Sequence, residues 1–223
     1  MDPESWAGSV NLNTPAAELL RRLAAALPKT GEFTITVFGS APIQITIDSA
    51  LVSADVDVFS DFEGLAELVE RAGLGENKAT FSIQVSSEIN FRVGPRWKDR
   101  AKRTRIGNCT FVLPHPIDIL IAKLSRLEEK DIRAFEIVRA KTGHPTEAEL
   151  IAELQMAVDL FRPSFAEEQG HDMAENCRRL WPLLYGREID PRKEIIAPAL
   201  AKRKAGYGQG GPDHKQELRD ALR

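Results

Sequence analysis

Hydrophobic and polar residues alternate along much of the first half of the chain, as they do in β-strands that bury one face. This pattern predicts four strands, over residues 33–38, 54–59, 81–93 and 109–113. The first is β-branched and ends directly at Gly39-Ser40. The third is the longest, with its apolar side chains on one side and its polar side chains on the other. The first half is therefore expected to fold around a sheet.

Between these strands, apolar residues recur every three or four positions, which predicts amphipathic helices. The expected helices cover residues 15–27, 41–50 and 62–72. The first begins with Thr14 and Pro15, a residue pair suited to a helix N-cap and first helical position. The second assignment is open, because the isoleucines within 41–50 also favour a strand, whereas Pro42 suits the start of a helix.

After Pro114 the strand pattern disappears, and helices are predicted over residues 117–141, 146–161 and 167–185. The whole pattern predicts an α/β fold, a mixed twisted sheet with flanking helices, followed by a helical C-terminal domain. We assign residues 1–113 to the α/β domain, 114–200 to the helical domain and 201–223 to a polar tail.

Composition excludes several classes of protein. The 223 residues carry a formal net charge of −3, which argues against generic polyanion binding. Cys109 and Cys177 are the two cysteines, and neither has metal-type spacing, so we expect reduced thiols and neither zinc nor a disulfide framework. No apolar stretch approaches ~20 residues and the first ten residues have no signal-peptide core. We expect no membrane contact and a cytoplasmic protein.

Two acidic residues in the second predicted strand carry the clearest chemical signal. Asp55 and Asp57 are two positions apart, so both side chains point to the same face of the sheet. Two carboxylates side by side repel each other unless a divalent cation such as Mg²⁺ neutralises them. The earlier turn at Gly39-Ser40 can aim backbone N–H groups at a phosphate. Together these features indicate metal-assisted chemistry on a nucleotide.

A basic segment follows the third predicted strand. It contains seven cationic residues and a single acid, Asp99: the cations are Arg92, Arg96, Lys98, Arg100, Lys102, Arg103 and Arg105. Two interpretations are open, a solvated loop or an electropositive rim for a triphosphate or an RNA acceptor. Trp97 within the segment either stacks on a base or packs beneath the loop.

With these pieces in order, the sequence resembles the nucleotidyltransferase-fold superfamily, over roughly residues 14–138. The first similarity is Phe38-Gly39-Ser40 followed by Asp55-Val56-Asp57. The second runs from Pro114-His115-Pro116-Ile117-Asp118 to Lys123-Leu124, with Arg126 and Glu129-Lys130-Asp131 beyond it, and Trp97 and Arg100 match a further element. Within the superfamily the chain looks most like uncharacterised bacterial enzymes related to abortive-infection (AbiEii-like) and toxin–antitoxin proteins.

The resemblance implies Mg²⁺-dependent transfer of a nucleoside monophosphate from an NTP to an acceptor, tRNA or a protein side chain. It implies that Asp55 and Asp57 hold Mg²⁺ and that Gly39 and Ser40 approach the phosphates. The resemblance to toxin–antitoxin proteins also implies a role as a toxin, with an antitoxin as its partner.

The remaining implied site residues are Lys123, which would balance the β- and γ-phosphate charge, Asp131, which would position it, and Arg100 as a nucleotide-binding residue. Such enzymes usually have a third carboxylate on a neighbouring strand. Glu88 is our candidate, because it is the one acid on the polar face of the predicted 81–93 strand.

Two alternatives stay open. Related enzymes often have a second aspartate three residues after the Lys130-Asp131 pair, where this chain has Ala134. The first alternative is therefore a catalytically inactive module that binds nucleotide, RNA or protein. A third reading is nucleotidyl or phosphoryl transfer to a small molecule. The sequence does not indicate the oligomeric state.

Overall fold

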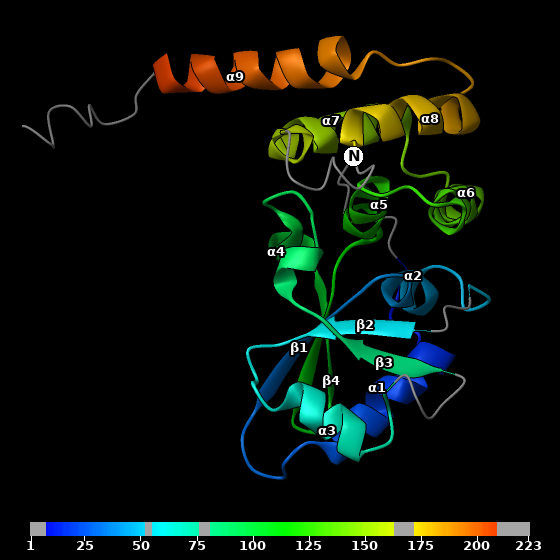
Figure 1. The fold of residues 1–223 in the computed structure, drawn as a ribbon. Coiled ribbons are helices and arrows are strands. Elements are labelled where there is room, and N and C mark those ends of the chain that lie inside the picture. The colour runs from blue at the N-terminus through cyan, green and yellow to red at the C-terminus, as the bar shows by residue number, and fades with distance from the viewer. Residues whose placement is uncertain (1–7, 52–54, 76–80, 163–171, 209–223) are drawn as a thin grey trace, which may run out of the picture.

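The computed structural model describes residues 8–51, 55–75, 81–162 and 172–208. Its first half contains a five-stranded mixed sheet with strand order β3-β2-β1-β5-β4 (Figure 1). The strands are β1 (Phe33–Phe38), β2 (Asp55–Phe59), β3 (Ser82–Val85), β4 (Lys102–Ile106) and β5 (Cys109–Leu113). The central strand β1 pairs antiparallel with β2 and parallel with β5, while β2 and β3 are parallel and β4 and β5 antiparallel. The predicted α/β fold, a mixed sheet with flanking helices, is confirmed.

The helices divide into those beside the sheet and those stacked at one end of it. The first group is α1 (Pro15–Ala26), α2 (Ala41–Thr46) and α3 (Leu65–Arg71). The second group is α5 (Pro116–Leu124), α6 (Glu129–Thr142), α7 (Glu147–Met156), α8 (Met173–Tyr185) and α9 (Ala197–Gly208). The short α4 (Trp97–Arg100) packs with the second group through Trp97 and Arg100. Short 3-10 turns η2 (Glu88–Asn90) and η3 (Val158–Phe161) and a π-helical turn η5 (Arg192–Ile196) complete the described elements.

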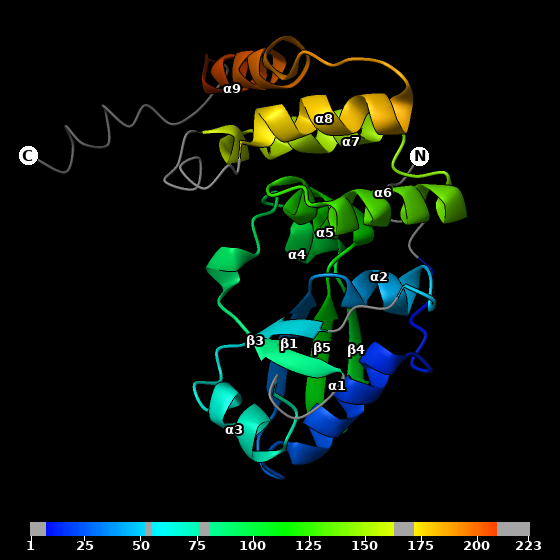
Figure 2. The same cartoon turned by 45° about the vertical axis from the view of Figure 1, so that its right-hand side comes forward.

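Figures 1 and 2 show how the second group is layered. Helices α5 and α6 lie next to the sheet, α7 and α8 lie beyond them, and α9 is farthest away. Among the described residues, no helix combines the length and apolar character that crossing a membrane requires.

The two faces of the sheet are used differently. One face is closed, because Ile35, Val37, Val56 and Val58 are fully or almost fully buried in a core that also contains the apolar sides of α1 and α3. Helix α1 begins where Thr14 caps it, accepting a hydrogen bond from the Ala17 N–H at 3.2 Å. The opposite face carries Thr34, Thr36 and the two acids of β2, as strand alternation requires.

A second core lies among the helices of the second half. It contains Ile117, Leu120, Phe135 and Trp181, all fully buried. Phe38 at the end of β1 and Val112 of β5 belong to this core, so the helical half packs directly against the sheet. This contact fixes helix α5 beside the end of β1.

The prediction of one long strand over 81–93 is wrong. Strand β3 ends at Val85, which pairs with Val58, one residue before the end of β2. The chain then turns through η2, capped by Ser87, whose Oγ accepts from the Ile89 N–H. Ile89, expected in the core, is 80% exposed.

Other boundaries also differ from the predictions. Strand β4 lies within the basic segment and was not predicted, because its alternation consists mainly of charged residues; it forms by pairing with β5 across a turn at Gly107, which has φ of +61°. The predicted 117–141 helix is two helices, α5 and α6, and the open 41–50 assignment is helical over Ala41–Thr46.

Several predicted features lie partly or wholly outside the described residues. These are the N-terminal residues 1–7, Ala54 of the second strand, residues 167–171 of the last predicted helix and residues 209–223 of the tail. Cys109 and Cys177 are both buried free thiols, in agreement with the prediction.

Candidate functional site

The turn after β1 and the acids of β2 meet at one point. Asp57 is the register partner of Phe38, which immediately precedes Gly39. Gly39 has φ of +67°, a left-handed conformation that glycine adopts without steric cost. A Cβ atom at this position would collide with the Asp57 carboxylate. The glycine is therefore required both by the backbone turn and by the closeness of Asp57.

Asp55 and Asp57 share a face of β2, as predicted, since Val56 and Val58 point into the closed core. Burial, and then the charge of Asp55, raise the pKa of Asp57. The cations Arg126 and Lys123 act in the opposite direction without cancelling this effect. Asp55 accepts a hydrogen bond from Ser82 Oγ at 3.0 Å. Half-buried neighbouring carboxylates of this kind form a donor set that fits a hard divalent cation.

A cavity of about 380 Å³ opens beside Asp57. Its lining comes from the end of β1, from β2, from the β3–η2 region and from α5 with the turn that follows: Phe38, Gly39, Asp57, Gln84, Ser86, Ile89, Asn90, Arg92, Ile119, Ala122, Lys123, Ser125 and Arg126. The cavity thus has an acidic corner, a wall of neutral hydrogen-bonding side chains and a cationic wall.

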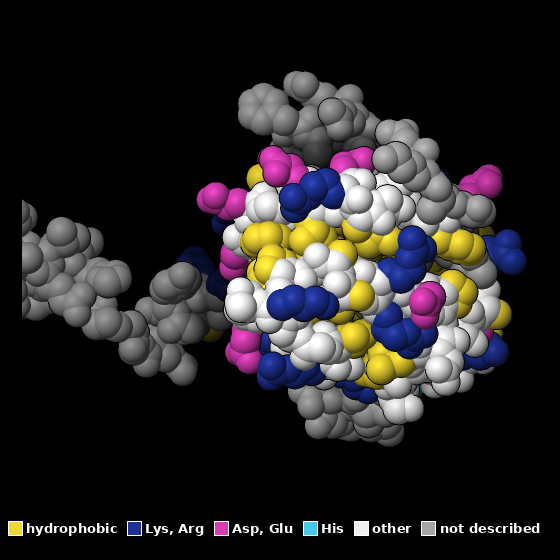
Figure 3. Space-filling view, turned by 90° about the horizontal axis from the view of Figure 1, so that it is seen from below, with side chains coloured by type: hydrophobic (Ala, Val, Ile, Leu, Met, Phe, Trp, Pro, Cys, Tyr) yellow, Lys and Arg dark blue, Asp and Glu magenta, His cyan; other side chains and the backbone are white. Residues whose placement is uncertain are grey.

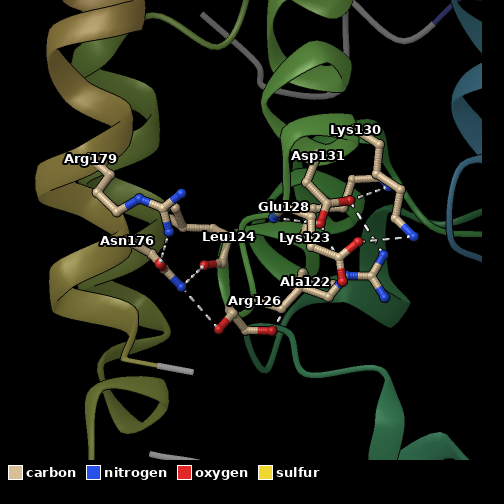
Figure 4. Close-up of polar contacts among 10 residues, drawn as sticks. Ala122, Lys123, Leu124, Arg126, Glu128, Lys130, Asp131, Asn176 and Arg179 are labelled. Atoms are coloured by element: carbon tan, nitrogen blue, oxygen red, sulfur yellow. Dashed lines mark hydrogen bonds and ion pairs between the residues drawn. The ribbon is translucent and has the colours of Figure 1, made fainter. Parts of the chain in front are cut away.

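The cationic wall is held by one buried acid. Asp131 Oδ1 accepts from Lys123 Nζ at 2.8 Å, and its Oδ2 accepts from Arg126 Nε at 3.0 Å and from the Glu128 N–H at 3.2 Å (Figure 4). Burial acts against the ionised form, but hydrogen bonds from Arg126 and Lys123 outweigh it and hold the pKa of Asp131 below its usual value. We call Lys123, Arg126 and Asp131 the open cluster, because both of its cations line the cavity.

In the open cluster two cations share Asp131, and Arg126 also lies 3.6 Å from Glu128 Oε1, an acid that pairs in turn with Lys130 at 3.0 Å. Lys123 has three donor hydrogens and Arg126 has five, so a single carboxylate cannot use them all. Arg126 is 42% exposed at its side chain, whereas Lys123 is almost buried at 6%. The predicted contact between Lys123 and Asp131 is present, and Arg126 joins it.

Glu88 does not lie in this cavity. Since β3 ends before it, Glu88 stands on η2, where it forms an exposed ion pair with Lys98 at 3.0 Å. It lines a different cavity, together with Trp97 and Arg103. The β3 residue opposite Asp57 is Gln84, a neutral amide. Across the described residues, no group of three or more His, Cys, Asp or Glu side chains is arranged to hold a metal.

Arg100 also lies elsewhere. It is 8% exposed and donates two hydrogen bonds to Asp118 of α5, Nε to Oδ2 at 2.7 Å and Nη2 to Oδ1 at 2.6 Å. Its Nη1 lies 2.8 Å from Glu153 Oε1 of α7. We call Arg100, Asp118 and Glu153 the closed cluster. It joins α4, α5 and α7, so the structure gives Arg100 a role in packing and not in the cavity.

The basic segment is divided among separate partners. Lys98 pairs with Glu88 and lies 5.3 Å from the Trp97 ring centroid, and Arg105 pairs with Glu32 at 2.9 Å. Trp97 is 7% exposed and packs edge-on against Phe91, as expected for a tryptophan beneath a loop. Figure 3 shows the end of the sheet away from the helical half, where Lys and Arg side chains stand apart among uncharged and hydrophobic ones.

Ser40 follows Gly39 at the start of α2 and is half-buried, and its side chain does not cap that helix. Sequence reasoning did not assign a role to Arg126 or to the neutral residues Gln84, Ser86 and Asn90. The sequence did contain an indication for Arg126, because residues three positions apart at the end of a helix point to the same side, and Arg126 comes three residues after Lys123. The neutral wall had a partial signal, because Gln84, Ser86 and Asn90 lie on the polar side of the predicted 81–93 strand.

A family model described as "Nucleotidyltransferase of unknown function (DUF6036)" matches residues 17–173. Comparisons with curated proteins and with solved structures each found no match. The matched residues include all five strands of the sheet and the two helices that carry the open cluster.

Proposed function

Because the chain belongs to this family of nucleotidyltransferases of unknown function, we propose that it transfers a nucleoside monophosphate from an NTP to an acceptor hydroxyl. The observation that carries the proposal is the convergence of Gly39, Asp57 and the open cluster on one cavity. An acidic corner for a cation and a cationic wall for phosphates are the two parts that a metal–triphosphate complex needs.

In this proposal Asp55 and Asp57 hold Mg²⁺, which supplies charge neutralisation for the triphosphate. The fit rests on two carboxylates of one strand face: Asp57 lines the cavity and has a raised pKa, and Asp55, which is not among the lining residues, is two positions before it. Mg²⁺ commonly takes one or two protein carboxylates and completes its shell with substrate phosphates and water. Two acids are therefore sufficient, and we assign no role to Glu88.

The chain's own residues orient the triphosphate. Gly39 lets a phosphate approach the backbone, and Ser40 adds a hydroxyl beside it. Lys123 and Arg126 bind the β- and γ-phosphates. As the acceptor oxygen bonds to the α-phosphorus, the bond from that phosphorus to the α–β bridging oxygen breaks, pyrophosphate leaves, and the hydroxyl proton of the acceptor passes to solvent. Asp131 keeps both cations aimed at the cavity.

The finer parts of the proposal rest on the motif resemblance alone. They are an acceptor on tRNA or on a protein side chain, a kinship with abortive-infection enzymes, a toxin role with an antitoxin partner, and a cytoplasmic location. Within the cationic segment, Arg92 lines the cavity beside Asp57, whereas Lys98, Arg100 and Arg105 form separate ion pairs.

The test is transfer of label. Each α-labelled NTP is incubated with Mg²⁺, bulk tRNA and cell lysate, for the parent protein and for Asp57→Asn and Lys123→Met. Asp61→Asn is the matched control, because Asp61 is an exposed acid two residues beyond β2 and does not line the Asp57 cavity. We expect label transfer by the parent and the control only. Equal transfer by the parent and Asp57→Asn would refute the assignment.

A second candidate is a module that binds nucleotide without transferring it. Gln84 favours it, because a neutral amide stands opposite Asp57 where a third carboxylate would complete the acidic corner. Calorimetric titration with NTPs, with and without Mg²⁺, separates the candidates when combined with the label assay. Binding without transfer supports the module, and absence of metal-dependent binding removes the enzyme.

A further inference from the structure

The turn between α5 and α6 decides where the cations of the open cluster point. Lys123 is in the last turn of α5, Arg126 is in the connecting segment and Asp131 is in the first turn of α6. Leu127 has φ of +44° and is 1% exposed, a left-handed conformation that is costly for a side chain of this size. Such a turn persists when its surroundings hold it in place.

The backbone carbonyl groups at the end of α5 show what holds the turn. The Ala122 carbonyl accepts from the Ser125 N–H and from Ser125 Oγ. The Lys123 carbonyl accepts from the N–H groups of Arg126 and Leu127. These local bonds leave the next two carbonyls, of Leu124 and Ser125, to find partners outside the turn.

Both of those carbonyls are bound by Asn176 of α8, which is distant in sequence and 2% exposed. Its Nδ2 donates to the Leu124 carbonyl at 3.0 Å and to the Ser125 carbonyl at 3.2 Å (Figure 4). Its Oδ1 accepts from Arg179 Nη1 at 3.3 Å. All three contacts agree with a single orientation of the amide. One side chain thus completes the hydrogen bonding of the α5 end.

We propose that Asn176 is a positioning residue for phosphate binding. It fixes the 124–127 turn so that Lys123 and Arg126 face the cavity before a triphosphate arrives. Without its amide, the carbonyls of Leu124 and Ser125 lose their donor and the strained turn is free to relax, which moves both cations. The inference rests on the proposed function, and it adds to the site a residue beyond the span that the family model matches.

The experiment uses Mg²⁺ with inorganic tripolyphosphate as the probe, because it requires no knowledge of the preferred base. Binding is measured by calorimetry for the parent, Asn176→Asp, Arg126→Met and the double variant. Asn176→Asp keeps the shape of the side chain and removes the donor. Cys177→Ala is the matched control, since Cys177 is the next residue of α8 and is fully buried.

We expect Asn176→Asp to weaken binding about five- to tenfold, the effect of one or two lost hydrogen bonds. The affinity of Cys177→Ala for the probe should stay within about twofold of that of the parent, even if its melting temperature falls as far as that of Asn176→Asp. In the Arg126→Met background, Asn176→Asp should weaken binding by clearly less than it does in the parent, because Asn176 acts on binding through the position of Arg126. Full additivity would overturn the positioning role, as would unchanged binding by Asn176→Asp.

Hydrogen–deuterium exchange of residues 122–128 without ligand gives a second readout. Asn176→Asp should speed exchange there more than Cys177→Ala does, and equal exchange would overturn the inference. The two failures are distinguishable. If the parent does not bind the probe or any NTP, the proposed function falls together with the inference; if the parent binds and Asn176→Asp binds equally, the inference alone falls.

Discussion

Helix α5 belongs to two clusters of charged side chains that look alike in the sequence and differ in the structure. In the closed cluster, one cation, Arg100, is shared by two acids. In the open cluster, one acid, Asp131, is shared by two cations. The first is sealed between helices, and the second faces the cavity beside Asp57.

The electrostatic consequences are opposite. Burial raises the pKa of Asp118 even though Arg100 donates hydrogen bonds to it. The pKa of Asp131 is lowered, because two cations outweigh its burial. Donors left over in the open cluster can bind an anion, whereas the closed cluster has one cation for two acids and none to spare. The ratio of cations to acids, and not the presence of charged residues, separates the site from the scaffold.

The largest expected effect is on stability and comes from removing the cation of the closed cluster. Arg100→Met leaves Asp118 and Glu153 buried without their cation, and we expect a loss of about 3–5 kcal/mol in the free energy of unfolding. Urea denaturation measures it, with Arg103→Met, an exposed arginine of the adjacent β4, as the control. A loss of less than about 1 kcal/mol would mean that the cluster does not hold α4 to α5 and α7.

The open cluster should respond to Lys123→Met in binding more than in stability. We expect the affinity for Mg²⁺–tripolyphosphate to fall roughly tenfold to a hundredfold, as for a lost hydrogen bond between charged groups. Stability should fall less than in Arg100→Met, because Arg126 still pairs with Asp131. Retained affinity together with a large loss of stability would place Lys123 in the scaffold.

Asp57→Asn should produce a smaller effect of opposite sign on stability. Since the pKa of Asp57 is raised above 3.8 in the folded protein, the protonated group favours folding, and this contribution is lost as pH rises through the raised pKa. At neutral pH without metal, the variant should therefore melt above the parent, and the difference should shrink as pH falls below that pKa. Melting curves over a pH series, with and without Mg²⁺, measure it.

Addition of Mg²⁺ is the control for the prediction on the melting temperature of Asp57→Asn. The ion should raise the melting temperature of the parent and not of Asp57→Asn, and its effect on the parent should weaken as protons compete for Asp57 at low pH. A parent that melts above the variant at neutral pH without metal would show that Asp57 is not a destabilised carboxylate.

The smallest effect is expected for Glu88→Gln. Its ion pair with Lys98 joins side chains that are 57% and 62% exposed, so the stability change should be below about 0.5 kcal/mol. Label transfer should stay within about twofold of the parent. A severe loss of transfer would show that Glu88 reaches the site in the working enzyme and would restore it as the third carboxylate.

Local sequence determined much of this protein. The β-branched run before Gly39, the spacing of Asp55 and Asp57 and the cap at Thr14 each fix backbone or side-chain direction within a few residues. For that reason β1, the shared face of the two acids and the start of α1 follow from the sequence alone. The contact between Lys123 and Asp131 followed from the resemblance that the sequence carries.

Tertiary structure decided the rest, because it depends on which segments meet. The pairing of β3 with β2 ends at Val85, which leaves Glu88 off the sheet, and the register of the same two strands puts Gln84 opposite Asp57. Helix packing decided that Arg100 would be sealed between two acids, and that Asn176, far along the chain, would complete the turn that carries Arg126. A charge pattern in one segment contains no information about its partners, and partners determine whether a charged group stabilises the fold or binds a ligand.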